Sequence, residues 1–115
     1  MTHTNYDCNL GCPVEATLEV IDGKWKGVIL YHLLAHTTRF NELRRIMPGI
    51  TQKMLTKQLR ELEADGLISR KIYPEVPPRV EYSMTQYGKT LTPIIEALHA
   101  WGKQHLENPQ RETSK

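Results

Sequence analysis

The chain has 115 residues, of which 39% are hydrophobic, and its formal net charge at pH 7 is only +2. This length allows one domain with one core, and the near balance of charge excludes a uniformly basic or acidic protein. The N-terminus lacks a secretory signal pattern, and the longest uncharged run, residues 27–38, is too short to span a bilayer. We therefore expect a cytoplasmic protein with no membrane partner.

Two helices are expected in the first third of the chain. Pro13 suits a first helical turn and apolar residues follow it at helical spacing, which predicts a helix from about residue 13 to Asp22. Apolar residues from Trp25 to Leu34 recur over a wide side, as in a core helix, so a second helix should end near residue 36. Residues 1–11 are expected to form a flexible N-terminal segment.

The middle of the chain has the pattern of a short helix, a tight turn and a longer helix. Apolar residues in 40–47 predict the short helix, with Asn41 as its N-cap, and the Pro-Gly pair at 48–49 ends it. Thr51 is then expected to cap a helix over residues 51–65, along which three leucines recur at spacings of four and three before an Asp-Gly pair.

The last third of the chain predicts a β-hairpin and a long helix. Residues 68–73 and 79–84 alternate partially and are separated by a proline-rich stretch, which indicates a stiff hairpin tip. Thr85 is expected to cap a long final helix whose narrow apolar stripe suits a partner helix. The stripe consists of Leu91, Ile94, Ile95, Leu98 and Trp101. The expected fold class is therefore mainly α with a small β-hairpin (α+β), followed by a disordered tail at 108–115.

The helix at 51–65 has side chains suited to DNA. In a helix-turn-helix, one exposed side of the second helix enters the major groove. If the leucines point inward, the opposite side holds no carboxylate, and it consists of Gln52, Lys53, Thr56, Lys57 and Arg60. Gln can bond adenine, Lys and Arg can bond guanine or a phosphate, and Thr can bond a base edge or contact a thymine methyl.

The charge around this helix is locally basic. From residue 39 to residue 60 there are six basic residues and one acid, Glu42, a pattern that favours a phosphate-binding surface. An ordinary solvated helix would show a similar charge run, and Arg79 beside the proline-rich tip fits either a DNA contact or a solvated turn. The candidate DNA contacts are Arg39, Arg44, Thr51, Gln52, Lys53, Thr56, Lys57, Arg60 and Arg79.

Seven stretches, in the same order, resemble the HxlR-type branch of the bacterial MarR-like winged helix-turn-helix transcriptional regulators. They extend from residue 12 to about residue 102; each is weak alone, but their order is specific. The stretches are Cys12-Pro13-Val14, Gly23-Lys24-Trp25-Lys26, Arg39-Phe40-Asn41-Glu42-Leu43-Arg44-Arg45, Pro48-Gly49-Ile50-Thr51-Gln52-Lys53-Met54-Leu55, Leu59-Arg60-Glu61-Leu62-Glu63-Ala64-Asp65-Gly66-Leu67-Ile68, Pro77-Pro78-Arg79-Val80-Glu81-Tyr82 and Thr85-Gln86-Tyr87-Gly88.

The resemblance implies a winged helix-turn-helix domain over residues 12–107, with helix 51–65 in the major groove and the 68–84 hairpin as the wing. It implies a homodimer that forms through the first and last helices and binds a pseudo-palindromic double-stranded DNA operator. The expected dimer interface is the stripe of the final helix. The resemblance also implies a transcription regulator. An enzyme is not expected, because the short chain has no Gly-rich phosphate loop and no paired carboxylates at a conspicuous spacing, so no catalytic residue or cofactor is predicted. A zinc site is not expected either, because it needs four ligands and Cys8, Cys12 and His3 supply at most three.

Both cysteines, Cys8 and Cys12, lie near the N-terminus. At a helix start, unpaired N–H groups and the helix dipole favour a thiolate at Cys12, although Glu15 in the first turn opposes this. Members of the resembled family use a cysteine in the same Cys-Pro setting to sense electrophiles or oxidants, which implies redox sensing by Cys12. Cys8 is then a resolving thiol or a passenger, and a bridge to the other subunit is a competing arrangement. Alternatively, Cys12 is a small, partly buried residue without a signalling role.

Two alternatives to a thiol-sensing regulator remain open. One is a regulator that responds to a small molecule bound between its DNA-binding and dimer helices. The other is a winged-helix protein interaction module, whose basic surface binds an acidic partner. The steep salt dependence of phosphate contacts would distinguish a DNA-binding protein from such a module.

Overall fold

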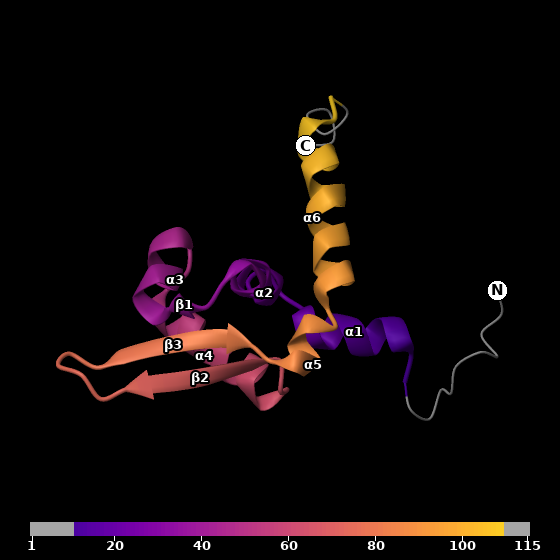
Figure 1. Ribbon diagram of the computed structural model, residues 1–115. Coiled ribbons are helices and arrows are strands. Elements are labelled where there is room, and N and C mark those ends of the chain that lie inside the picture. Colours follow the sequence, from indigo (N-terminus) through magenta and orange to yellow (C-terminus); the bar gives the residue numbers. More distant parts are fainter. Residues whose placement is uncertain (1–10, 110–115) are drawn as a thin grey trace.

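The computed structural model describes residues 11–109; the expectations for the N-terminal segment, for Cys8 and for the end of the tail fall on residues 1–10 and 110–115, outside the described residues. The elements are α1 (Pro13–Ile21), α2 (Lys26–Ala35), β1 (Thr38–Arg39), α3 (Phe40–Ile46), α4 (Gln52–Ala64), β2 (Ile68–Tyr73), β3 (Arg79–Met84), α5 (Gln86–Lys89) and α6 (Thr92–Glu107). The expected fold class, a mainly α winged helix-turn-helix with a small β-sheet, is confirmed (Figure 1). Within residues 11–109, no helix is long and apolar enough to cross a membrane.

The core forms where α2, α3, α4 and the sheet meet. Ile29 and Leu30 of α2 are fully buried, as expected for a helix that is apolar over a wide side. The three leucines of α4 are also buried, so α4 packs one side on the core and presents the other side to solvent. This arrangement confirms the inward direction that the leucine spacing predicted.

Threonine caps begin two of the helices. The Thr51 hydroxyl accepts a hydrogen bond from the Met54 amide at 3.0 Å, which satisfies one of the free N–H groups at the start of α4. The Thr85 hydroxyl accepts from the Gly88 amide at 2.9 Å in the same way. Gly66 has a φ of +78°, which few other residues tolerate, and it ends α4 as the sequence predicted.

The sheet has three antiparallel strands in the order β1-β3-β2. The β2–β3 hairpin is the expected wing, with Tyr73 opposite Arg79 at its outer end and Ile68 opposite Met84 at its inner end. β1 was not predicted, because two residues are too few to show alternation. Its Thr38 lies opposite Tyr82, and both side chains are buried.

Two expected helix starts are wrong. Asn41 is not the N-cap of α3, because the chain leaves β1 in extended conformation at Arg39 and the helix begins at Phe40. Thr85 does not cap the long final helix but the four-residue α5. The long helix α6 begins at Thr92, with a proline in its first turn, where the missing N–H is tolerated.

The apolar stripe of the final segment is divided between two environments. Leu91 and Ile95 are buried in the core of this chain, so the expectation that the whole stripe faces a partner helix is corrected for these two residues. Ile94, Leu98 and Trp101 are 39%, 51% and 68% exposed. As Figure 1 shows, α6 extends away from the sheet, so its outer turns have few neighbours of their own chain to cover them.

Candidate nucleic-acid interface

The solvent side of α4 carries the side chains that the sequence singled out. Gln52, Lys53, Lys57 and Arg60 are exposed, Thr56 is half-buried, and the Thr51 cap is exposed as well. The inward leucines hold this side outward, because turning α4 about its axis would expose them to water. The burial pattern agrees with the predicted stripe, and DNA contact by these residues stays a prediction.

The basic residues of the helix-turn-helix fall into two groups. Arg45 forms an ion pair and hydrogen bond with Glu42, and the Lys57 ammonium lies 3.7 Å from the Glu61 carboxylate. The second group is exposed and forms no ion pair within residues 11–109, and it comprises Arg39, Arg44, Lys53 and Arg60. Unpaired cations lose no protein partner when they meet a phosphate, so the second group has the lower cost of binding DNA.

Arg79, the expected wing contact, interacts with other residues of its own hairpin. Its guanidinium lies 3.3 Å from Glu75 and 3.4 Å from Glu81, and it stacks over the Tyr73 ring at 4.0 Å. Two carboxylates thus neutralise its charge, which weakens its attraction to a phosphate. The wing tip beside it is apolar and fully exposed at Val76.

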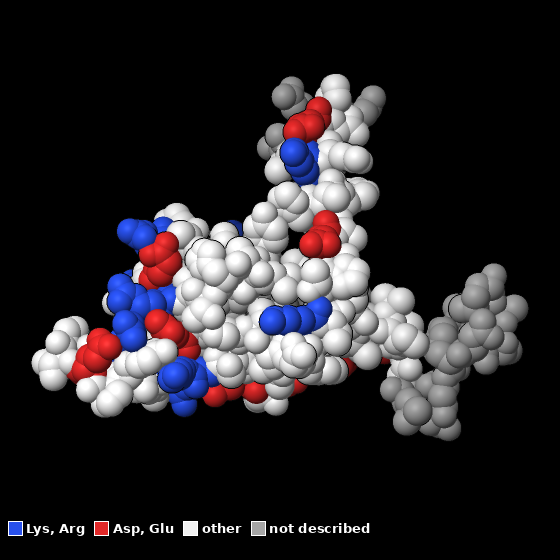
Figure 2. All heavy atoms as spheres, viewed as in Figure 1, with Lys and Arg blue, Asp and Glu red and all other residues white. Residues whose placement is uncertain are grey.

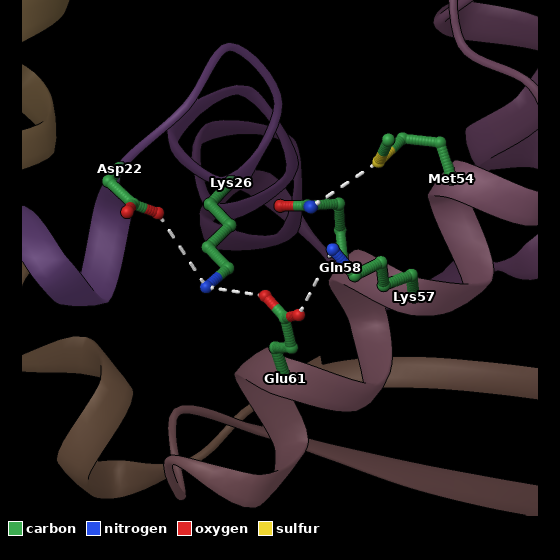
Figure 3. A network of polar contacts seen from close by, with 6 residues as sticks. All are labelled: Asp22, Lys26, Met54, Lys57, Gln58 and Glu61. Atoms are coloured by element: carbon green, nitrogen blue, oxygen red, sulfur yellow. Dashed lines mark hydrogen bonds and ion pairs between the residues drawn. The ribbon is translucent and has the colours of Figure 1, made fainter.

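A buried lysine at the start of α2 contacts α4. Lys26, at the start of α2, has a side chain that is only 8% exposed, and its ammonium lies 2.8 Å from Glu61 and 3.8 Å from Asp22 (Figure 3). Glu61 also faces Lys57, so it joins the core-facing lysine to a lysine on the solvent side of α4. The hydrogen bond from Lys26 is the main cause that lowers the pKa of Glu61; burial opposes it, and Lys57 adds a smaller lowering effect.

Lys26 was not predicted as a site residue, because the Gly23-Lys24-Trp25-Lys26 stretch indicated only a family resemblance. One signal was present, since Lys26 precedes Ile29 and Leu30 by three and four residues and so shares their buried side. Its carboxylate partner on α4 is distant in sequence and could not be identified from spacing.

Cys12 lies at the N-cap of α1, as predicted. Its side chain is half-buried, makes no capping hydrogen bond and has a free thiol. Glu15 occupies the first turn, as the sequence indicated. The partner role of Cys8 lies outside the described residues.

An apolar groove lies between α1, α2 and α6. It has a volume of about 660 Å³ and is lined by Leu18, Val28, Tyr31, Leu98 and His99, among others. Tyr31 stacks on His99 with 4.8 Å between ring centroids, which joins α2 to α6 across the groove. Val14, Leu18 and Val28 are exposed nearby, so the α1 side of the chain presents uncovered apolar surface.

Charged side chains are unevenly distributed over the face of the molecule that contains α3, the hairpin and α6. Figure 2 shows basic and acidic side chains gathered over α3 and the hairpin, whereas the surface between them and α6 is mostly uncharged. The described residues contain no group of three or more His, Cys, Asp or Glu side chains that could hold a metal ion.

Comparison with known proteins gives consistent matches along most of the chain. A family model described as HxlR-like helix-turn-helix matches residues 20–110. YybR of Bacillus subtilis, described as an uncharacterized HTH-type transcriptional regulator, is 59% identical over 97 residues, which cover 84% of this chain and 78% of that protein.

Solved structures match as well. The redox regulator HypR in its oxidized form superimposes with a TM-score of 0.78 at 59% identity, over 81% of this chain and 96% of that chain. The reduced form of the transcriptional regulator YodB from B. subtilis matches with a TM-score of 0.69 at 34% identity, over 81% and 92% of the two chains. The similarity thus includes the arrangement of the elements as well as the sequence.

Proposed function

This chain belongs to the HxlR-like helix-turn-helix family and is a transcriptional regulator rather than an enzyme, and we propose that it binds a DNA operator as a homodimer. α4 would enter the major groove and the β2–β3 hairpin would contact the adjacent backbone as the wing. A regulator of chromosomal genes works where the chromosome is, so a cytoplasmic location is part of the proposal. The pseudo-palindromic form of the operator would follow from the twofold symmetry of the dimer.

One observation carries the DNA proposal: the solvent side of α4 holds exposed, unpaired cations beside hydrogen-bonding side chains. Lys53 and Arg60 have no carboxylate partner among residues 11–109, and Gln52 lies next to Lys53 at the N-terminal end of the helix. The N-terminal end is the part of a recognition helix that contacts base edges. No carboxylate of the described residues therefore competes with a DNA phosphate for Lys53 or Arg60.

The uncovered apolar surface supports the dimer proposal. Ile94, Leu98 and Trp101 on α6, together with Val14 and Leu18 on α1, are exposed although each is large and apolar. Burying such side chains against a second copy is favourable by about 1.5 to 3 kcal/mol for each fully buried residue. We propose that this surface, reduced from the predicted stripe by the two residues buried in the protomer, forms the dimer interface.

We also propose that oxidants or electrophiles regulate the protein through Cys12. The position of the thiol at the start of a helix supports this chemistry, and the structurally matched HypR is a redox regulator. With diamide as oxidant, the Cys12 thiol and a second thiol would form one disulfide bond. The two protons and two electrons would pass to the azo group of diamide, which becomes a hydrazine.

The test is selection of bound duplexes from a random DNA pool by the purified protein, with and without diamide. We expect one enriched pseudo-palindrome in reduced protein and a change of its affinity on oxidation. Cys12→Ser should bind the same sequence and lose the response. A mutant that responds like the parent would remove Cys12 from the proposal, and a pool without enrichment would contradict sequence-specific binding.

The groove between α1, α2 and α6 favours a second mode of control, by an apolar small molecule. Its volume of about 660 Å³ is in the range of ligand pockets, and most of its lining is apolar. Such a ligand would change operator affinity equally in the parent and in Cys12→Ser. A protein interaction module would instead show weak binding to any duplex with little salt dependence.

A further inference from the structure

Lys26 differs from the other lysines and arginines near α4 because it is buried. Its side chain is 8% exposed, whereas the Glu61 and Asp22 side chains that it contacts are 40% and 64% exposed. A buried ammonium is costly unless carboxylates are close, and the 2.8 Å contact with Glu61 supplies that partner. Lys26 therefore ties the start of α2 to the third turn of α4.

Glu61 divides its two oxygens between two lysines. One oxygen accepts from Lys26 at 2.8 Å, and the other lies 3.7 Å from Lys57. Figure 3 shows the Lys26 and Lys57 side chains approaching the carboxylate from opposite sides. The shorter contact is the one to the buried lysine, so Lys57 is held more loosely.

The charges in this cluster explain why the sharing of Glu61 between Lys26 and Lys57 matters for DNA binding. Lys26 and Lys57 balance Asp22 and Glu61, so the cluster as a whole is neutral. Without Lys26, the Glu61 carboxylate would have Lys57 as its one cation, and the pair would face the DNA with its charge cancelled. A lysine that is 65% exposed and only loosely paired can instead turn to a phosphate.

We propose that Lys26 is a positioning residue for DNA binding. Its ion pair with Glu61 fixes the position of α4 against α2 and leaves the Lys57 ammonium available to a DNA phosphate. This inference rests on the proposed DNA contact by α4. It adds a residue that never touches DNA to those that determine the strength of binding.

The experiment measures how affinity for a labelled random-sequence duplex falls with salt, by fluorescence anisotropy. Each phosphate contact contributes about 0.9 to the slope of log affinity against log salt concentration, so Lys57→Ala should reduce the slope by about 2 per dimer. Lys26→Met should also reduce the slope, although Lys26 is buried and by less than Lys57→Ala, because Glu61 then has Lys57 as its nearest cation and an exposed pair competes only in part with a phosphate. A purely structural ion pair would change stability and leave the slope of the folded protein unaltered.

Removal of the carboxylate supplies the decisive control. Glu61→Gln should keep the parent slope or make it steeper, and the double variant Lys26→Met with Glu61→Gln should regain the parent slope. The double variant keeps the test valid if Lys26→Met or Glu61→Gln alone does not fold, because it removes both members of the ion pair and leaves no buried charge without its partner. Circular dichroism checks that each variant is folded.

Three results would overturn the inference. The first is a salt slope in folded Lys26→Met that equals the slope of the parent. The second is a salt slope in Glu61→Gln that is lower than the slope of the parent. The third is a salt slope in the double variant that is as low as the slope of Lys57→Ala. Failure of the proposed function looks different, because the parent protein itself would then show no steep salt dependence. A steep parent slope with no effect of Lys57→Ala would overturn the role of Lys57 while DNA binding stands.

Discussion

Gly88 is the position where the smallest substitution should have the largest structural effect. It is buried in α5, and a Cβ built on it would lie 2.0 Å from the carbonyl oxygen of Leu67 and 2.9 Å from the terminal methyl of Met84. Nonbonded heavy atoms keep about 3.5 Å apart. In Gly88→Ala, the backbones at Gly88 and Leu67 must therefore separate by about 1 Å or more, since a backbone oxygen cannot change rotamer as a side chain can.

The cost follows from what Leu67 already does. Its carbonyl accepts hydrogen bonds from the Thr85 amide at 3.0 Å and from the Thr85 hydroxyl at 3.1 Å, and the separation weakens both. Overpacking usually costs about 1 to 3 kcal/mol, and we expect about 3 kcal/mol here because the obstacle is hydrogen-bonded backbone. At about 4 °C for each kcal/mol, the melting temperature should fall by about 12 °C.

The assay is urea and thermal unfolding of parent and variant at one protein concentration. Gly102→Ala is the matched control, because Gly102 lies in α6 and a Cβ added there would meet no atom within 4 Å. Alanine there should change stability by no more than about 1 kcal/mol, in the stabilising direction that helix propensity gives. If Gly88→Ala lost no more stability than the control, the close approach of α5 to Leu67 would be refuted.

Three further predictions test other parts of the molecule. Arg60→Ala should reduce the salt slope of DNA binding by about 2 per dimer, whereas Arg45→Ala, whose arginine is already paired with Glu42, should change it less; equal effects would contradict the distinction. Trp101→Glu should dissociate the dimer in sedimentation experiments while the protomer stays folded, and an unchanged dimer would exclude the outer turns of α6 from the interface. The lowered pKa of Glu61 means that its ion pair stabilises the folded protein above the ordinary value of 4.5 and is lost as pH falls below it, so the stability difference between parent and Glu61→Gln should shrink on acidification; a difference that grew would reverse the sign of this linkage.

Elements with strong local signals could be predicted from the sequence. The leucine spacing of α4, the Thr51 cap and the left-handed Gly66 each act within one or two helical turns, so the chain around them is enough to identify the helix. The two hairpin strands were found for the same reason, because their turn residues lie between them. These elements also carry most of the candidate DNA contacts.

What could not be predicted depends on contacts between distant segments. Thr85 is a good cap, yet its helix ends after four residues, and only the proline at position 93 indicated that a new helix starts there. Ile95 and Leu98 belong to one apolar stripe in the sequence, but α2 covers the first and leaves the second exposed. The ion pair of Lys26 likewise joins two helices whose relation only the tertiary fold defines.

The connection between α4 and α6 determines how two recognition helices would be spaced in a dimer. The end of α4 runs through Gly66 and Leu67 into β2, and the carbonyls of both residues accept hydrogen bonds from Thr85, at the end of β3. α5 is capped by the same threonine and leads directly into α6. Thr85 therefore links the residues that follow α4 to α5, the short helix that precedes the proposed dimer helix. Half-sites on DNA lie about 34 Å apart, so a small rotation at the dimer interface would be enough to move the two helices out of register with the major groove.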